Sequence, residues 1–169
     1  MKAADIVVGR WGARAFGRRI PCTVGRAGIV AAAAKREGDG ATPAGTHRIV
    51  GMLYRPDRIA ATALPDWALP FGPPDLWSDD ARDEEYNLMV RTPHGFGHER
   101  LTRGDPMYDL ILISDWNWPE AVPGRGSAIF LHTWRRPLAR TAGCAAFAKA
   151  DLMWIAGRIT HQTRLIIRA

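Results

Sequence analysis

A cysteine and a histidine twelve residues apart are the side chains of this sequence best suited to covalent chemistry. Cys144 lies in the segment 140–146, Arg-Thr-Ala-Gly-Cys-Ala-Ala, where small neighbours leave its sulfur little steric cover and Gly143 permits an unusual backbone conformation. A thiol nucleophile needs a base, and His132 directly follows the apolar run 128–131, at the expected end of a strand. The pair predicts a cysteine nucleophile activated by an imidazole. Taken alone, it also fits a buried structural cysteine beside a surface histidine.

Short apolar runs between turn-forming residues are the elements that must position this pair. The chain has 17 glycines and 12 prolines, and short apolar runs bounded by Gly, Pro and Asp are typical of strands. Such runs cover residues 5–8, 19–24, 47–50, 110–113, 128–131 and 165–167. Several short strands without regular helices between them predict one mostly β domain over residues 1–169, built as a β-sandwich or a barrel-like fold.

One short helix is expected after the cysteine. Residues 151–159 place apolar side chains at helical spacing, among them Leu152 and Ile155, and begin with an aspartate that suits a first turn. The alanine-rich stretch 29–35 is a weaker helix candidate, because the sequence Glu-Gly-Asp-Gly follows it. The stretch 56–85 contains five prolines and is expected to be mostly loop, with a length typical of a lid or a binding wall.

Three segments occur in a characteristic order: 40–46 (Gly-Ala-Thr-Pro-Ala-Gly-Thr), 126–132 (Gly-Ser-Ala-Ile-Phe-Leu-His) and 141–144 (Thr-Ala-Gly-Cys). Together they resemble the L,D-transpeptidase catalytic domain, the YkuD family. In that family a Thr-Pro-x-Gly segment opens the domain, an upstream histidine is the base, and a Ser/Thr-x-Gly-Cys segment carries the nucleophile. The resemblance runs from about residue 20 to the expected helix. Glu-Arg-Leu at 99–101 and Tyr-Asp-Leu at 108–110 also look like a compact branch of this family.

The resemblance implies a YkuD-like β-sandwich that transfers acyl groups on the stem peptides of peptidoglycan, without a cofactor. Cys144 would attack the carbonyl on the carboxyl side of a diaminopimelate residue and expel the terminal D-amino acid. The thioester would then pass its acyl group to an amine of a second stem. His132 would carry the proton, and backbone N–H groups near Gly143 would stabilise the oxyanion. A variant branch could form a different cross-link, such as L-alanine to diaminopimelate.

Two positions depart from the family pattern. Ala142 stands where the commonest pattern has a second histidine, and Ala146 stands where a basic residue often follows the cysteine. Substrate carboxylates must therefore be held elsewhere, and the loop between the histidine and the cysteine offers Arg135, Arg136 and Arg140. The other side chains expected to contact substrate are Thr141, Trp134, His98 and Tyr86.

The composition limits the classes of partner. The 169 residues carry a net charge of +6, and 20 of the 23 basic residues are arginines, which pair bidentately with carboxylates and phosphates. The arginines are dispersed, so basicity alone does not predict nucleic-acid binding. Two cysteines are too few for a disulfide scaffold, and Cys22 lies in an apolar run typical of the core. Clusters with the spacing of metal ligands are absent, and no apolar run approaches the ~18 residues of a membrane span.

Several alternatives stay open. The same acyl-enzyme could serve a carboxypeptidase or an amidase, and a non-catalytic peptidoglycan-binding module is a further hypothesis, with a nucleic-acid binder last. The expected substrate points to the cell envelope or periplasm. The N-terminal residues show no export signal, so two alternatives stay open: export by another route, or a cytoplasmic location in which the substrate is a peptidoglycan precursor or turnover fragment. The sequence specifies neither the acceptor amine nor the oligomeric state.

Overall fold

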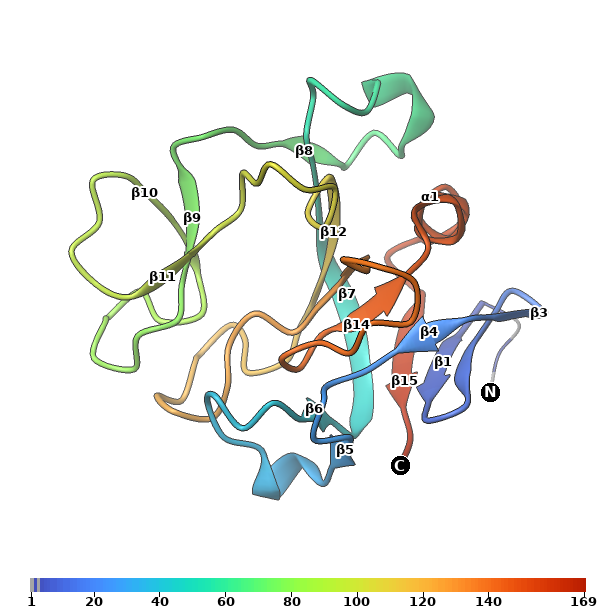
Figure 1. Ribbon diagram of the computed structural model, residues 1–169, viewed down its shortest axis with the longest axis horizontal. Coiled ribbons are helices and arrows are strands. Elements are labelled where there is room, and N and C mark those ends of the chain that lie inside the picture. Colours follow the sequence, from blue (N-terminus) through green and yellow to red (C-terminus); the bar gives the residue numbers. More distant parts are fainter. Residues whose placement is uncertain (1, 3) are drawn as a thin grey trace.

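The residues that the structure describes form mainly short β-strands and one α-helix (Figure 1). The computed structural model describes residue 2 and residues 4–169. Ten strands form the main sheet, in the order β3–β2–β1–β15–β7–β12–β13–β14–β4 with β8 beside β7. Their bounds are β1 Ile6–Gly9, β2 Gly12–Ala15, β3 Arg18–Ile20, β4 Cys22–Thr23, β7 Gly45–Tyr54, β8 Leu69–Pro70, β12 Leu110–Ser114, β13 Phe130–Thr133, β14 Ala145–Phe147 and β15 Arg164–Ile167.

Two features close this sheet almost into a barrel. The ten-residue strand β7 pairs with β15 through its first half and with β12 through its second half, so it belongs to both sides of the sheet. The two edge strands, β3 and β4, are consecutive in the chain and are separated by Pro21 alone. Proline has no N–H to donate to a ladder, so the chain leaves one edge of the sheet and enters the other at this residue.

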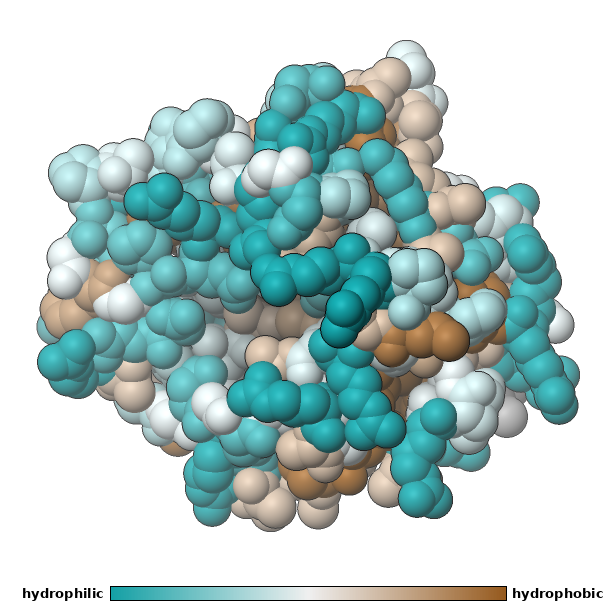
Figure 2. Space-filling model, viewed as in Figure 1, coloured by the Kyte–Doolittle hydropathy of each residue, from teal (hydrophilic) through white to brown (hydrophobic). Residues whose placement is uncertain are grey.

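The core lies inside the curved sheet and under the helix. Alternate strand residues point inward, as Ile6 and Val8 of β1 and Leu110 and Leu112 of β12 do. The helix α1, Lys149–Ala156, packs on β12 and β13 and buries Leu152, Ile155 and Ala156. Hydrophilic side chains cover much of the face seen in Figure 2, with hydrophobic patches on the side where β1 and β4 lie.

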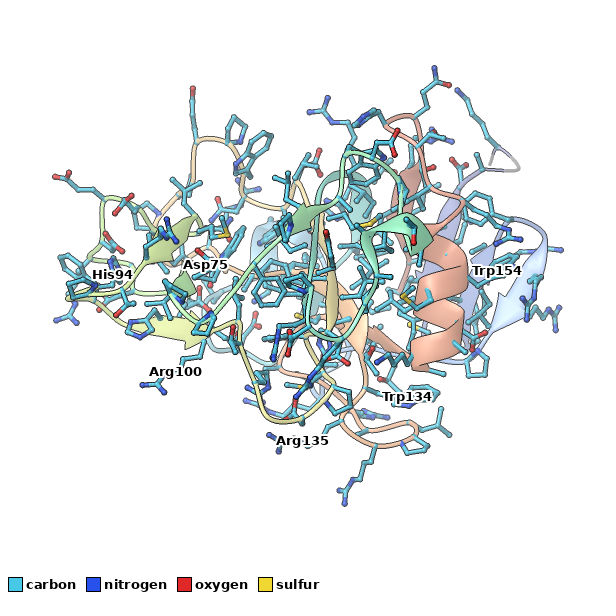
Figure 3. All side chains as sticks on the ribbon, turned by 90° about the horizontal axis from the view of Figure 1, so that it is seen from above. Asp75, His94, Arg100, Trp134, Arg135 and Trp154 are labelled. Atoms are coloured by element: carbon cyan, nitrogen blue, oxygen red, sulfur yellow. The ribbon has the colours of Figure 1, made fainter. Side chains whose placement is uncertain are left out.

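Two smaller sheets and two single turns of 3-10 helix complete the fold. β9 (Asp75–Ser78) pairs with β10 (Met89–Arg91) and β11 (His98–Arg100), and β5 (Ile29–Val30) pairs with β6 (Thr42–Pro43). The 3-10 turns are Ala32–Ala34 and Ala61–Ala63. Seen from above, the three-stranded sheet with Asp75 and Arg100, and His94 between β10 and β11, lie at the opposite end of the molecule from Trp154 of α1 (Figure 3).

Most of the expected elements are present. The mostly β fold is confirmed, each of the six apolar runs contains or overlaps a strand, and the helix after the cysteine starts two residues earlier than predicted. The helix predicted for 29–35 is wrong, because this stretch holds β5 and one 3-10 turn without a side-chain cap. The stretch 56–85 is mostly loop, although β8 and β9 lie within it. No described helix has the length and apolar character needed to cross a membrane.

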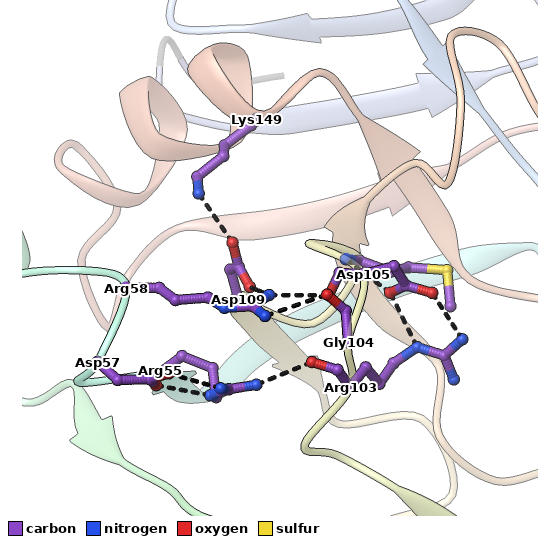
Figure 4. Close-up of polar contacts among 9 residues, drawn as sticks. Arg55, Asp57, Arg58, Arg103, Gly104, Asp105, Asp109 and Lys149 are labelled. Carbon is purple, nitrogen blue, oxygen red and sulfur yellow. Dashed lines mark hydrogen bonds and ion pairs between the residues drawn. The ribbon is translucent and has the colours of Figure 1, made fainter.

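A network of ion pairs holds the loop at 103–109 against its neighbours (Figure 4). The buried carboxylate of Asp109 pairs with Arg58 and with Lys149, each at 2.8 Å. Arg55 donates to the backbone oxygen of Arg103, and Arg58 donates to the oxygens of residues 104 and 105. Guanidinium groups satisfy several acceptors at once, so two arginines on one turn fix a loop that has no regular structure of its own.

Candidate active site

The thiol of Cys144 opens onto a cavity of about 650 Å³. The residue directly precedes β14 and is 9% exposed. Its Sγ donates to the backbone oxygen of Ala128 at 3.0 Å and accepts the N–H of Phe130 at 3.4 Å. The backbone of Ala128 has a φ of +50°, and its N–H donates to the side chain of Asn87. The segment before β13 therefore holds the sulfur at a fixed place on the cavity wall.

His132, the third residue of β13, lies on the same cavity. Its Nδ1 is 2.8 Å from the backbone oxygen of Thr133, and a carbonyl oxygen only accepts, so Nδ1 carries the proton. Nε2 is therefore the unprotonated nitrogen, the one that can accept a proton. The ring of Tyr108 packs edge-on against the imidazole, with 5.2 Å between ring centroids. A backbone carbonyl and an aromatic ring thus orient the histidine.

Burial keeps both groups neutral. It lowers the pKa of His132 to about 4 and raises the pKa of the Cys144 thiol to about 12. The carboxylate of Glu99 adds to the rise for the thiol, while the N–H of Phe130 and the charge of Lys35 oppose it. At neutral pH the site therefore holds a thiol and a neutral imidazole rather than a thiolate–imidazolium pair.

Two threonine hydroxyls shape the loop that presents the cysteine. Thr141 Oγ1 donates to the oxygen of Cys144 at 2.7 Å and accepts the N–H of Gly143. Thr42, from the Thr-Pro-Ala-Gly segment, donates to the oxygen of Gly143 at 2.6 Å and accepts the N–H of Gly25 at 2.9 Å. A side chain at Gly143 would be crowded, since a Cβ there would lie 3.1 Å from the oxygen of Ala41. Segments distant in sequence thus meet behind the nucleophile.

The structure brings most of the predicted substrate contacts to the same cavity. Its walls include the predicted side chains Trp134, Arg135, Arg136, Arg140 and Thr141. Tyr86 and His98 do not line it. Tyr86 is buried behind the wall, where its hydroxyl contacts Glu37 and the N–H of Gly126. His98 lies in β11, and its Nδ1 is bonded to the oxygen of Phe96.

Sequence reasoning gave no role to several charged residues of the cavity. Glu37, Asp79 and Glu99 line it together with Lys35. Glu99 accepts the hydroxyl of Tyr108 at 2.7 Å, and burial raises its pKa, as it does that of Asp79. The Glu-Arg-Leu and Tyr-Asp-Leu segments were visible as family-like motifs, but only the fold brings their glutamate and tyrosine together.

The family model of the L,D-transpeptidase catalytic domain, YkuD, matches residues 10–167. The chain belongs to this family. No curated protein and no solved structure matches the sequence. The match covers nearly the whole chain and supports a role in peptidoglycan chemistry at the level of the domain.

Within this L,D-transpeptidase domain, the two departures from the family pattern have different surroundings. Ala142 is exposed on the cavity wall, so the missing histidine leaves open space there. Ala146 is fully buried in β14, beside His132 across the parallel pair and opposite Thr23 on the other side. A long basic side chain has no space at that position, and the arginines of the loop 134–144 supply positive charge to the cavity of Cys144 instead.

Thr42→Val tests the support behind the nucleophile. The substitution keeps the shape of the side chain but leaves the N–H of Gly25 and the oxygen of Gly143 without their buried partner. We expect the free energy of unfolding to fall by about 2 kcal/mol in urea denaturation. Thr46→Val, at an exposed position of β7, is the matched control and should change it by less than ~0.5 kcal/mol. Equal stability of the two variants would contradict this account of the loop.

The neutral resting pair predicts the pH dependence of thiol alkylation. Because the raised pKa of Cys144 keeps the thiolate fraction small, iodoacetamide should label this residue at least ~100-fold more slowly than a free cysteine at pH 7.5. The rate should keep rising as pH increases toward about 12. Peptide-level mass spectrometry separates this signal from that of Cys22. A rate that reached its plateau near pH 6 would indicate a thiolate–imidazolium pair instead.

Proposed function

We propose that the protein is a cysteine-dependent L,D-transpeptidase, formed by one catalytic domain over residues 1–169, that joins stem peptides of peptidoglycan. One observation carries the proposal: the thiol of Cys144 and the imidazole of His132 face one cavity, and the bond from Nδ1 leaves Nε2 as the proton acceptor. Membership of the YkuD family supplies the chemistry that such a pair would perform.

In the first step the thiol proton of Cys144 moves to Nε2 of His132 as the sulfur attacks the substrate. The sulfur attacks the carbonyl that follows a diaminopimelate residue, and the C–N bond to the terminal D-amino acid breaks. The leaving amine takes the proton from Nε2, so the thioester forms beside a neutral imidazole. The acceptor amine then attacks the thioester, gives its proton to His132 and releases the thiol, which regains that proton. Water in place of the amine would make the enzyme a carboxypeptidase or amidase.

The electrostatics of the cavity suit a concerted first step. With the pKa of the thiol raised to about 12 and that of the imidazole lowered to about 4, a separated thiolate and imidazolium would be strongly disfavoured before substrate binds. Proton transfer is therefore coupled to the attack on the carbonyl. The Gly143 N–H is held by Thr141, so we assign the oxyanion to the N–H of Cys144.

The charges of the cavity suit a zwitterionic substrate. Arg135, Arg136 and Arg140 form one group, and the carboxylates of Glu37, Asp79 and Glu99 form another. Diaminopimelate carries a free ammonium and a free carboxylate on the same carbon of its side chain. We assign its carboxylate to the arginines and its ammonium to Glu99. Such a substrate also locates the reaction at the cell wall, in the envelope or periplasm.

Purified disaccharide-tetrapeptides distinguish the possible activities. We expect the wild type to form cross-linked dimers, detected by mass spectrometry, and Cys144→Ala to form none. Cys22→Ala removes the other cysteine, which is buried in the core, and should keep cross-linking. Fragmentation of the dimer identifies the acceptor, including an L-alanine to diaminopimelate bond. Dimers made by Cys144→Ala would overturn the mechanism, and trimmed monomers alone would show a hydrolase.

Glu99→Gln tests the recognition of the ammonium group. The amide keeps an acceptor for the Tyr108 hydroxyl but loses the negative charge, so we expect KM for tetrapeptide stems to rise about tenfold with kcat within threefold. Glu120→Gln, at an exposed position away from the cavity, is the control. A fall in kcat with unchanged KM would instead mean that Glu99 acts through Tyr108 on His132.

A further inference from the structure

A second cavity, of about 1060 Å³, lies beside the first and has no part in the chemistry described so far. Strands β1, β2, β3 and β4 form most of it, near the closure of the sheet. Its charged lining consists of Arg10, Arg14, Arg19, Arg140 and Arg168, with no carboxylate among the described residues. We call it the arginine groove. The strands that form it lie on the right of Figure 1, where hydrophilic side chains surround hydrophobic patches in Figure 2.

The arginines of the groove lack the partners that other arginines of this protein have. Eight arginines form ion pairs with carboxylates: Arg18, Arg48, Arg55, Arg58, Arg82, Arg91, Arg103 and Arg164. None of the five groove arginines has a carboxylate within 4 Å among the described residues. The groove is therefore a concentration of unbalanced positive charge.

The sheet register places two of the groove arginines next to each other. Arg14 and Arg19 stand directly opposite each other across the antiparallel pair of β2 and β3. Directly opposite residues share a face, and like charges there repel each other and destabilise the sheet. Both side chains are exposed and neither has a carboxylate partner among the described residues, so the pair is accessible to an external anion that would compensate its charge.

Trp11 adds an aromatic surface to the same groove. It lies in the turn between β1 and β2 and is 61% exposed. Its indole rests on the backbone of Gly9, where a Cβ would come within 2.5 Å of Nε1. Gly9 thus lets the indole lie close to the backbone, while much of the ring stays exposed to solvent. An exposed, supported indole is suited to pack on the apolar face of a sugar ring.

One loop separates the arginine groove from the catalytic cavity. Trp134, Arg135 and Arg136 line the cavity of Cys144, Leu138 lines the groove, and Arg140 lines both. The hydroxyl of Thr23 in β4 holds this loop by donating to the oxygen of Ala139 at 2.8 Å. A ligand chain that leaves the catalytic cavity past Arg140 enters the groove directly.

We propose that the arginine groove is a second binding site for peptidoglycan, which holds the carboxylates of a further stem peptide while Trp11 packs against the glycan chain. This assignment rests on the proposed function, because the polymer that occupies the catalytic cavity is the one that reaches across Arg140. Peptidoglycan supplies both kinds of group that the groove is suited to bind, carboxylates for the guanidinium groups and sugar rings for the indole. The groove then gives the enzyme a preference for glycan strands over single disaccharide-peptides.

Binding to uncross-linked glycan strands with tetrapeptide stems tests the proposal. The Cys144→Ala protein is titrated with labelled strands, followed by fluorescence anisotropy. We expect Arg14→Gln/Arg19→Gln to raise Kd at least tenfold. The charge-matched control is Arg100→Gln/Arg158→Gln, whose arginines line neither cavity, and it should change Kd less than twofold. Removing the opposed charges should leave the unfolding midpoint unchanged or higher, so weakened binding would not reflect misfolding.

Chemically altered ligands identify the group that the groove recognises. Strands with amidated stem carboxylates should bind the parent protein and the groove variant with equal affinity, because the groove then has no carboxylate to hold. Poly(glycerol phosphate) should compete poorly; equal competition would mean that the groove is a phosphate site and would overturn the proposal. An equal loss of binding in the groove and control variants would overturn it as well, by showing an effect of net charge alone.

Catalytic assays separate this proposal from the proposed function. On the background with Cys144 intact, Arg14→Gln/Arg19→Gln should cross-link single disaccharide-tetrapeptides as fast as the wild type but long strands about tenfold more slowly. Equal rates on long strands would contradict the proposed role of the groove. If no cross-links form with any substrate, the proposed function fails, whereas the binding experiments in the Cys144→Ala protein still decide whether the groove holds strands.

Discussion

The parallel pairing of β13 with β14 is the constraint on which the rest of the site depends. It sets Leu131 beside Ala145 and His132 beside Ala146, so His132 and the second residue after Cys144 are neighbours across one ladder. Parallel strands require a long crossover connection, because the chain must return to the same end of the sheet. Here residues 134–144 make that connection without a helix. The loop that the topology demands is also the loop that carries the arginines and the cysteine.

Burial keeps both Cys144 and His132 uncharged. A sulfur held between the oxygen of Ala128 and the N–H of Phe130 is a protonated thiol, and a histidine bonded to a carbonyl through Nδ1 is a neutral base. Thiol enzymes with an exposed ion pair have a reactive sulfur at all times. In this site the raised pKa of Cys144 keeps the thiolate fraction small, which lowers the reactivity of the free thiol toward oxidants and alkylating agents.

The sequence allowed much of the fold and part of the site to be predicted. The strands that hold the core, such as Leu110–Ser114, have an apolar pattern of their own, and the Thr-Ala-Gly-Cys segment marks the loop of the nucleophile. His98 and Tyr86 were expected to line the cavity because they are near family-like or acidic segments in the sequence. Neither lines it: His98 is bonded to the oxygen of Phe96, and Tyr86 is buried behind the wall, where it contacts Glu37. The hydrogen bond between Glu99 and Tyr108 joins two segments that only the fold brings together, and Tyr108 adjoins Asp109 of the ion-pair network, so no local pattern reveals it.

The structure divides the arginines by what they contact. In the sequence the arginines are dispersed and resemble a solvated surface, but the fold sorts them into two groups. Those paired with carboxylates fix loops, as Arg55 and Arg58 do around residues 103–109. Of the unpaired ones, Arg26, Arg135 and Arg136 line the catalytic cavity, and Arg140 joins it to the arginine groove. Under the proposed function the enzyme joins two anionic strands and must hold both against their mutual repulsion. The guanidinium groups without a carboxylate partner among the described residues line the two cavities that meet at Arg140, and they suit that task.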